Sequence, residues 1–137
     1  MISMVRFTTG FGAWVVAIEH VLEVRPSTVV RPLPAPERGV AGVLDHNGVA
    51  VPVLTSLGVG RRHVLVLESG PTIAGVLVDE VTGVVSIELD RIGPAPAGQR
   101  AALVEGTVRE EGSDSDLVYV LDVGRALATA REMEKVS

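Results

Sequence analysis

Valine is the feature that most constrains the fold of this chain. Of its 137 residues, 26 are valine, about a fifth of the sequence. A β-branched side chain is stiff at χ1 and packs well on a pleated surface, so this excess favours strands over a helical bundle. The valines occur in short runs that alternate with stretches rich in glycine and proline, of which the chain has 15 and 8. This pattern is typical of antiparallel barrels or sandwiches, so the sequence predicts a mainly β fold.

The apolar runs predict nine strands and one closing helix. The strands are expected at residues 5–9, 13–18, 40–44, 49–54, 63–68, 72–78, 81–89, 104–109 and 117–121, with a bulge at Gly83. Residues 19–24 fit either a helical turn or a tenth strand. Residues 26–37 contain four prolines and are expected to be an extended connector or an edge strand, because proline fixes φ and donates no hydrogen bond. Asp122 is a suitable N-cap for a helix that continues to about residue 134.

Two hairpins and the lack of a long linker define the organisation of the chain. Asn47 and Gly48 lie between two apolar runs and both tolerate positive φ, which predicts a tight hairpin turn. A second hairpin is expected to join 104–109 to 117–121 through the acidic residues 110–116. No linker is long enough to separate independent domains, so residues 1–137 are expected to form a single domain.

Charge and composition exclude several classes of function. The formal charge is −5, from 12 basic and 17 acidic residues, which argues against nucleic acid because phosphate binding needs clustered Lys and Arg. Aromatic residues make up only 3% of the chain, which leaves little surface for stacking on bases. Cysteine is absent, and a reducing compartment is the simplest interpretation. Because neither a signal peptide nor a long apolar run is present, we expect a cytoplasmic protein without direct membrane insertion.

The polar residues form no recognisable catalytic or metal-binding motif. His20, His46 and His63 are far apart and do not share the short spacing of metal ligands, so no metal site is expected. Asp79 and Glu80 would point to opposite faces of a strand and would not converge on a substrate. The sequence therefore predicts no catalytic residue, no cofactor and no enzyme activity. It favours an interaction module that binds through strand faces and edges.

Several motifs follow one another in an order that resembles a known family. They are Leu33-Pro34, Val40-Ala41-Gly42-Val43, Asn47-Gly48-Val49-Ala50-Val51-Pro52-Val53, Gly75-Val76-Leu77-Val78-Asp79-Glu80-Val81 and Ile92-Gly93-Pro94-Ala95-Pro96, and then Gly106-Thr107-Val108 and residues 117–122. Together they resemble the CheW-like domain of bacterial chemotaxis over residues 5–127. The resemblance implies two pseudo-symmetric five-stranded SH3-like barrels that share a core, with a C-terminal α-helix. Branched side chains fill the interior of small barrels, which accounts for the valines.

The resemblance also implies a function. A CheW-like domain is expected to be a non-enzymatic adaptor that couples chemoreceptors to a CheA-type histidine kinase. Its partners would be the cytoplasmic tip of the receptors and the regulatory domain of the kinase, so it would reach the membrane array only through them. Two alternatives stay open: a divergent CheW-like scaffold that forms kinase-free assemblies, and a small-molecule-binding β-barrel protein that uses Asp79 or His46 as polar groups.

Carried over position by position, the resemblance implies two binding surfaces. The receptor-binding groove between the barrels would contain Val21, Glu23, Asn47, Gly75 and Val81, and the kinase-binding surface would contain Val24, Val30 and Ala50. Structural turns are expected at Gly42, Gly48 and Pro52. The chain departs from the family pattern at Asn47, where arginine is usual, at Thr55, where aspartate is usual, and in its short connection 57–63. Each valine also fits an ordinary core or strand residue.

Overall fold

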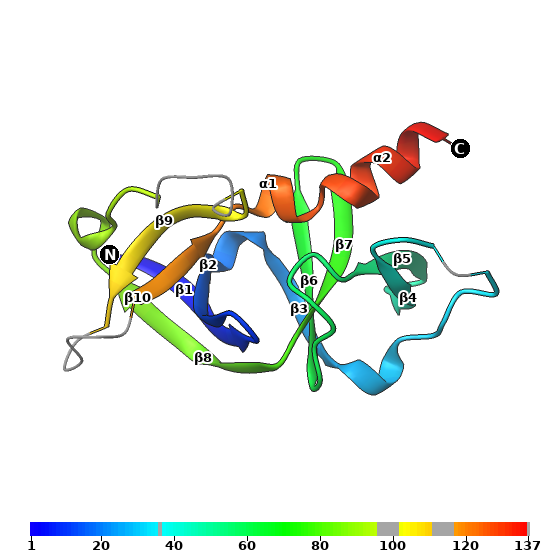
Figure 1. The fold of residues 1–137 in the computed structure, drawn as a ribbon, viewed down its shortest axis with the longest axis horizontal. Coiled ribbons are helices and arrows are strands. Elements are labelled where there is room, and N and C mark those ends of the chain that lie inside the picture. Colours follow the sequence, from blue (N-terminus) through cyan, green and yellow to red (C-terminus); the bar gives the residue numbers. More distant parts are fainter. Residues whose placement is uncertain (36, 96–101, 111–116, 137) are drawn as a thin grey trace.

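The chain folds into two five-stranded sheets that lie side by side (Figure 1). The computed structural model describes residues 1–35, 37–95, 102–110 and 117–136. One sheet consists, in spatial order, of β8 (Glu80–Ile87), β1 (Ile2–Thr9), β2 (Gly12–Ala17), β10 (Leu117–Leu121) and β9 (Val104–Arg109). The other consists of β3 (Val21–Pro26), β6 (His63–Ser69), β7 (Thr72–Val78), β5 (Val49–Leu54) and β4 (Val40–His46). The second sheet is thus one continuous segment, whereas the first combines both ends of the chain.

Both sheets repeat one pattern of strand pairing and closure. Reading each in spatial order, the pairs are antiparallel, antiparallel, parallel and antiparallel. In each sheet, the segment that follows one outer strand forms an isolated bridge to the outer strand on the other side. Gly93, after β8, pairs with Thr107 of β9, and Arg31, after β3, pairs with Val43 of β4. Each sheet is thereby closed, and the prediction of two pseudo-symmetric SH3-like barrels is confirmed. We call the barrel of β8, β1, β2, β10 and β9 the first barrel, and the other the second barrel.

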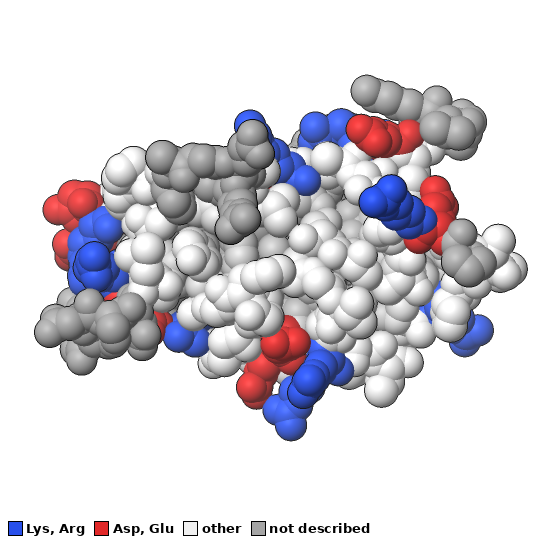
Figure 2. Space-filling model, in the orientation of Figure 1, with Lys and Arg blue, Asp and Glu red and all other residues white. Residues whose placement is uncertain are grey.

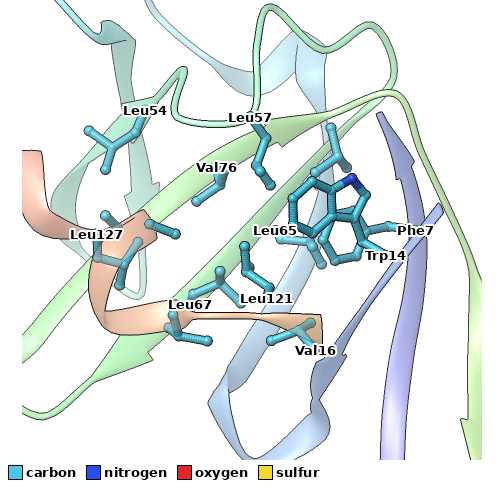
Figure 3. Close-up of a cluster of buried hydrophobic side chains, with 14 of the residues drawn as sticks. Phe7, Trp14, Val16, Leu54, Leu57, Leu65, Leu67, Val76, Leu121 and Leu127 are labelled. Carbon is cyan, nitrogen blue, oxygen red and sulfur yellow. The ribbon is translucent and has the colours of Figure 1, made fainter. Parts of the chain in front are cut away.

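Three clusters of buried apolar side chains stabilise this arrangement. The shared core combines both barrels with the C-terminal helices and includes Phe7, Trp14, Val16, Leu54, Leu57, Leu65, Leu67, Val76, Leu121 and Leu127 (Figure 3). The first barrel has its own cluster of Met4, Val15, Ile87, Val108, Val118 and Val120, and the second one of Leu44, Val51, Val53, Val64, Val66 and Leu77. Strand alternation separates the clusters, since Val66 points into the second barrel and its neighbour Leu65 into the shared core.

Three of the four aromatic residues join the barrels. The rings of Phe7 and Trp14 are stacked, with centroids 6.2 Å apart, and Trp14 packs at a tilt against Tyr119 at 5.1 Å. The indole Nε1 of Trp14 donates a hydrogen bond of 2.9 Å to the hydroxyl of Thr9, so its polar atom is satisfied inside the core. The fourth aromatic residue, Phe11, lies in the turn between β1 and β2 and is 70% exposed.

The connectors differ in part from the sequence prediction. Residues 18–26 contain both a helical turn and a strand, because η1 (Ile18–His20) leads directly into β3. The expectation of a wholly extended proline-rich connector is wrong, because η2 (Ser27–Val29) forms at its start. Similarly, β8 ends at Ile87, where we expected a strand to residue 89, and η3 (Leu89–Arg91) follows it.

The bulge and the helix cap are confirmed, but the closing helix is interrupted. The register of β1 and β8 shifts between Arg6 and Phe7, opposite Gly83. The Asp122 side chain accepts a hydrogen bond from the Arg125 backbone N–H at 3.1 Å. The helix divides into α1 (Val123–Ala126) and α2 (Ala128–Val136), because Leu127 between them leaves helical geometry and is fully buried in the shared core. Packing here overrides the local preference for a continuous helix.

Only one of the three expected turn residues lies in a turn. Asn47 and Gly48 have φ values of 50° and 85°, which is the backbone of the predicted tight turn between β4 and β5. Gly42 and Pro52 lie inside β4 and β5, so their assignment to turns was wrong. Gly42 has a packing role instead, because a Cβ at that position would overlap the carbonyl oxygen of Arg31 at the bridge that closes the second barrel.

Candidate interaction surfaces

A charged cluster connects β3 to β4 at the closure of the second barrel. The Glu23 carboxylate pairs with the Nδ1 of His46 and, at 3.3 Å, with Nη1 of Arg25. Arg25 also donates to the carbonyl oxygen of Asp45 at 3.4 Å. The hydrogen bond with His46 lowers the pKa of Glu23; desolvation opposes this effect and Arg25 adds to it. The side chain of Glu23 is only 26% exposed, so the cluster belongs to the closure of the barrel more than to an open surface.

The two faces of β3 have different surroundings. Glu23 and Arg25 pair with Val66 and Val64 of β6, and therefore share the face that points into the second barrel. Leu22 and Val24 are 38% and 41% exposed. Because successive strand residues point to opposite faces, Glu23 and Val24 cannot belong to one flat contact surface.

A groove of about 510 Å³ lies beside η2 on the second barrel. Its lining combines the arginines Arg25 and Arg31 and the acidic Asp45 with Thr28, Val29, Val43, Leu44 and Ala50. Of the residues expected on the kinase-binding surface, only Ala50 lines this groove. Val24 is exposed on β3, and Val30 is half-buried against the cluster of the second barrel. The structure therefore places the three residues on the same barrel but in separate settings.

Val21 and Val81, both expected in the receptor-binding groove, are half-buried against the shared core. They lie at opposite ends of β6: Val21 pairs with Leu67, and the Val81 N–H donates to Nδ1 of His63 at 3.0 Å. At about 3.3 Å per strand residue, the four steps from His63 to Leu67 correspond to roughly 13 Å. A partner would have to extend along the junction of the barrels to reach both valines.

The other expected groove residues are also dispersed. Gly75 is buried within β7, and a Cβ there would lie 2.7 Å from Cγ1 of Val64, so Gly75 allows close packing and offers no surface. Asn47 is exposed at the tip of the β4–β5 hairpin. Glu23 reaches His46, the residue next to Asn47. The pair therefore brings Glu23 of β3 close to the β4–β5 turn that contains Asn47.

Among the exposed apolar side chains that sequence reasoning missed, Phe11 and Val59 lie in connections between strands. Phe11 is 70% and Val59 is 84% exposed, and each stands between two glycines in a connection between strands. An apolar residue flanked by glycines in a turn was the signal that could have identified them. Both connections lie near residues 78–80, where the chain passes from β7 to β8. The Asp79 N–H donates to the carbonyl of Thr8, three residues before Phe11, at 2.9 Å, and Gly60, next to Val59, packs against the backbone of Val78.

Charged and apolar side chains lie together at this passage, where Arg62 pairs with Glu80 at 3.0 Å. Figure 2 shows that charged side chains on one face gather at its margins and that its centre is uncharged. Phe11 and Val59 add exposed apolar surface that a partner could cover.

The described residues offer little for chemistry. In residues 1–35, 37–95, 102–110 and 117–136, no group of three His, Cys, Asp or Glu side chains could hold a metal ion. Neither His46 nor Asp79 lines the groove beside η2. Within that same part of the chain, no helix is both long and apolar enough to cross a membrane.

Comparisons with known proteins agree with the fold. A family model for the CheW-like domain matches residues 3–131. Protein FrzA of Myxococcus xanthus is 33% identical over 125 residues, which cover 83% of this chain and 78% of that relative. The crystal structure of scaffolding protein TtCheW from Thermoanaerobacter tengcongensis matches with a TM-score of 0.75 at 20% identity, covering 89% of this chain and 84% of that one, and shows a shared fold. The chain therefore belongs to the CheW-like domain family, the adaptor and scaffold proteins of chemotaxis-type signalling.

Proposed function

We propose that this chain is a non-enzymatic adaptor that couples chemoreceptors to a CheA-type histidine kinase in the cytoplasm. The observation that carries the proposal is the family match from residue 3 to residue 131, which includes every strand of both barrels. The protein of similar fold from Thermoanaerobacter tengcongensis is a scaffolding protein, which supports the same kind of function. Binding through strand faces also suits a chain whose described residues form no metal-ligating cluster.

The kinase contact is best assigned to the exposed apolar face of β3. Val24 is 41% exposed on this strand, and Leu22, at the register shift between Val21 and Glu23, is 38% exposed. Val24 is followed by Arg25, whose side chain is 36% exposed, so a partner on this strand would meet apolar and charged groups together. Ala50 provides a second exposed contact on β5 of the same barrel.

The receptor contact is best assigned to the junction of the barrels. Val81 lies there between the barrels, and the exposed Phe11 and Val59 flank the same passage from β7 to β8. An apolar tip of a helical receptor bundle would cover these side chains. Asn47, which replaces the usual arginine, brings no positive charge to such a contact.

The kinase contact can be tested with isothermal titration calorimetry against the cognate kinase regulatory domain. Val24→Asp is expected to weaken binding at least about tenfold, because a carboxylate would be buried without a partner in an apolar contact. Val84→Asp is the matched control, since Val84 is an exposed valine in a strand of the first barrel. Normal binding by folded Val24→Asp would show that the kinase surface lies elsewhere.

The receptor contact can be tested with a soluble receptor tip. Phe11→Asp is expected to weaken binding to the tip and to leave kinase binding unchanged, because Phe11 lies on the other barrel from β3. A folded sample that binds neither partner would contradict the adaptor function. Self-association of that sample in size-exclusion chromatography with light scattering would then point to kinase-free assemblies.

A further inference from the structure

The three histidines of the chain differ in what their rings are bonded to. His20 and His46 each direct Nδ1 at an oxygen acceptor, a backbone carbonyl and a carboxylate respectively, so protonation of the ring keeps the hydrogen bond. His63 is the opposite case, because its Nδ1 accepts from the backbone N–H of Val81 at 3.0 Å. A ring nitrogen that accepts carries no proton, so His63 in this arrangement is neutral, with its proton on Nε2.

The hydrogen bond from Val81 to His63 joins the two barrels directly. His63 begins β6 of the second barrel, and Val81 lies at the start of β8 in the first. His63 pairs with Val78, which is buried in the shared core, so the ring lies on the face of β6 that meets the first barrel. Within its sheet β8 lies beside β1, and N–H groups on its other side need partners from elsewhere. The green segment that leads from β7 to β8 crosses between the barrels here (Figure 1).

The charged residues closest to His63 along the chain also connect the barrels. Arg62 precedes His63 and pairs with Glu80 of β8 at 3.0 Å. Protonation of the ring removes no donor or acceptor from this ion pair. The strands on either side of β6 place uncharged residues opposite His63, Pro26 on β3 and Val78 on β7. The other charged residues of the neighbouring segments are Arg61, Asp79, Arg6 of β1 and, on the opposite face of β3, Arg25.

We propose that neutral His63 is a positioning residue for the receptor contact, because it holds Val81 and the start of β8 against the second barrel, and that protonation of Nδ1 releases this hold. An imidazolium carries a proton on both nitrogens, so Nδ1 and the Val81 N–H would then face each other as two donors. Histidine is the side chain whose charge can change near neutral pH, so the hydrogen bond is present at high pH and is lost as the ring gains its proton. The inference rests on the proposed receptor contact, to which Val81 belongs.

NMR of the folded full chain tests the hydrogen bond without any partner. At about pH 8, imidazole ¹⁵N resonances are expected to place the His63 proton on Nε2, and a proton on Nδ1 would overturn the proposal. At the same pH, His63→Asn is expected to keep the slow exchange of the Val81 amide with solvent, because the asparagine Oδ1 can accept in place of Nδ1. His63→Leu has no acceptor and should raise the exchange rate about threefold to tenfold. Equal exchange rates in the two variants would also overturn the proposal.

The pH profile of binding to a soluble receptor tip tests the positioning role. Between about pH 8 and about pH 5, the unmodified chain is expected to lose about threefold to tenfold more affinity than His63→Asn, whose acceptor does not take up a proton. His20→Asn is the matched control and should keep the pH response of the unmodified chain, because the His20 ring faces a carbonyl. An equally steep response in His63→Asn would overturn the proposal. Failure of every folded variant to bind the tip would contradict the receptor contact and the positioning role with it, and the exchange of the Val81 amide would separately show whether His63 joins the barrels.

Discussion

The two barrels are built on one plan but differ in how they are closed. In each, an outer strand leads through a short helical turn to a bridge residue followed by proline, Arg31-Pro32 in the second barrel and Gly93-Pro94 in the first. The bridge meets a strand in which a glycine precedes the bridging residue, Gly42 in β4 and Gly106 in β9. A side chain would not fit at either glycine. Both barrels are therefore closed by the same local arrangement, a bridge to a strand in which glycine precedes the bridging residue.

The difference lies at the ends of the barrels. The second barrel is locked by the cluster of Glu23, His46 and Arg25, whereas the first contains a larger cavity with the pair of Arg6 and Glu110. Only Asn47 and Gly48 separate β4 from β5 in the second barrel, whereas residues 110–116 separate β9 from β10 in the first. The two barrels thus share one plan of closure but differ in the charged pairs beside it and in the length of one connection.

Substitution of Gly42 or Gly106, the glycines at the two closures, should cause the largest loss of stability, and the loss should differ between the barrels. A Cβ at Gly42 would overlap the backbone carbonyl of Arg31, whereas at Gly106 it would lie 2.9 Å from the Gly93 carbonyl oxygen. We expect Gly42→Ala to lower the free energy of unfolding by about 3 kcal/mol, because the backbone must move and the bridge hydrogen bonds weaken. Gly106→Ala should cost about half as much. Urea unfolding measures both, and equal losses would contradict the tighter closure of the second barrel.

Sequence reasoning could predict the strands because each is a short apolar run, as in the segments that became β6 and β7. It did not detect that the two halves of the chain repeat one plan. The number of residues between the bridging residue and the closing glycine differs, from Arg31 to Gly42 and from Gly93 to Gly106, and the two segments have little other sequence in common. It also could not predict the ion pair of Glu23 with His46. These residues come together only when the segment that follows β3 bridges to β4 and closes the barrel. Apolar patterns encode strands, but contacts between distant strands arise from closure of the barrel.

The tight turn of the second barrel should give an intermediate effect. Asn47 has a φ of 50°, a left-handed conformation that costs most residues about 1–2 kcal/mol. We expect Asn47→Ala to lower the free energy of unfolding by about 1 kcal/mol in urea unfolding. Asn47→Gly is the matched control and should change it by less than about 0.5 kcal/mol, because glycine adopts positive φ freely. An equal loss in both variants would show that the asparagine side chain, and not the backbone, stabilises the turn.

The charged cluster of the second barrel should give the smallest effect, and one that depends on pH. Its hydrogen bond with His46 holds the pKa of Glu23 below the ordinary value of 4.5, so the carboxylate stabilises the fold above pH 4.5 and loses this effect as the pH falls through the folded pKa. Glu23→Gln is expected to lower the free energy of unfolding by about 0.5–1 kcal/mol at pH 7, and by less at pH 3. Glu105→Gln, an exposed position of the first barrel, is the control. A difference between Glu23→Gln and the unmodified chain that is the same at both pH values would show that the ionised carboxylate does not stabilise this closure.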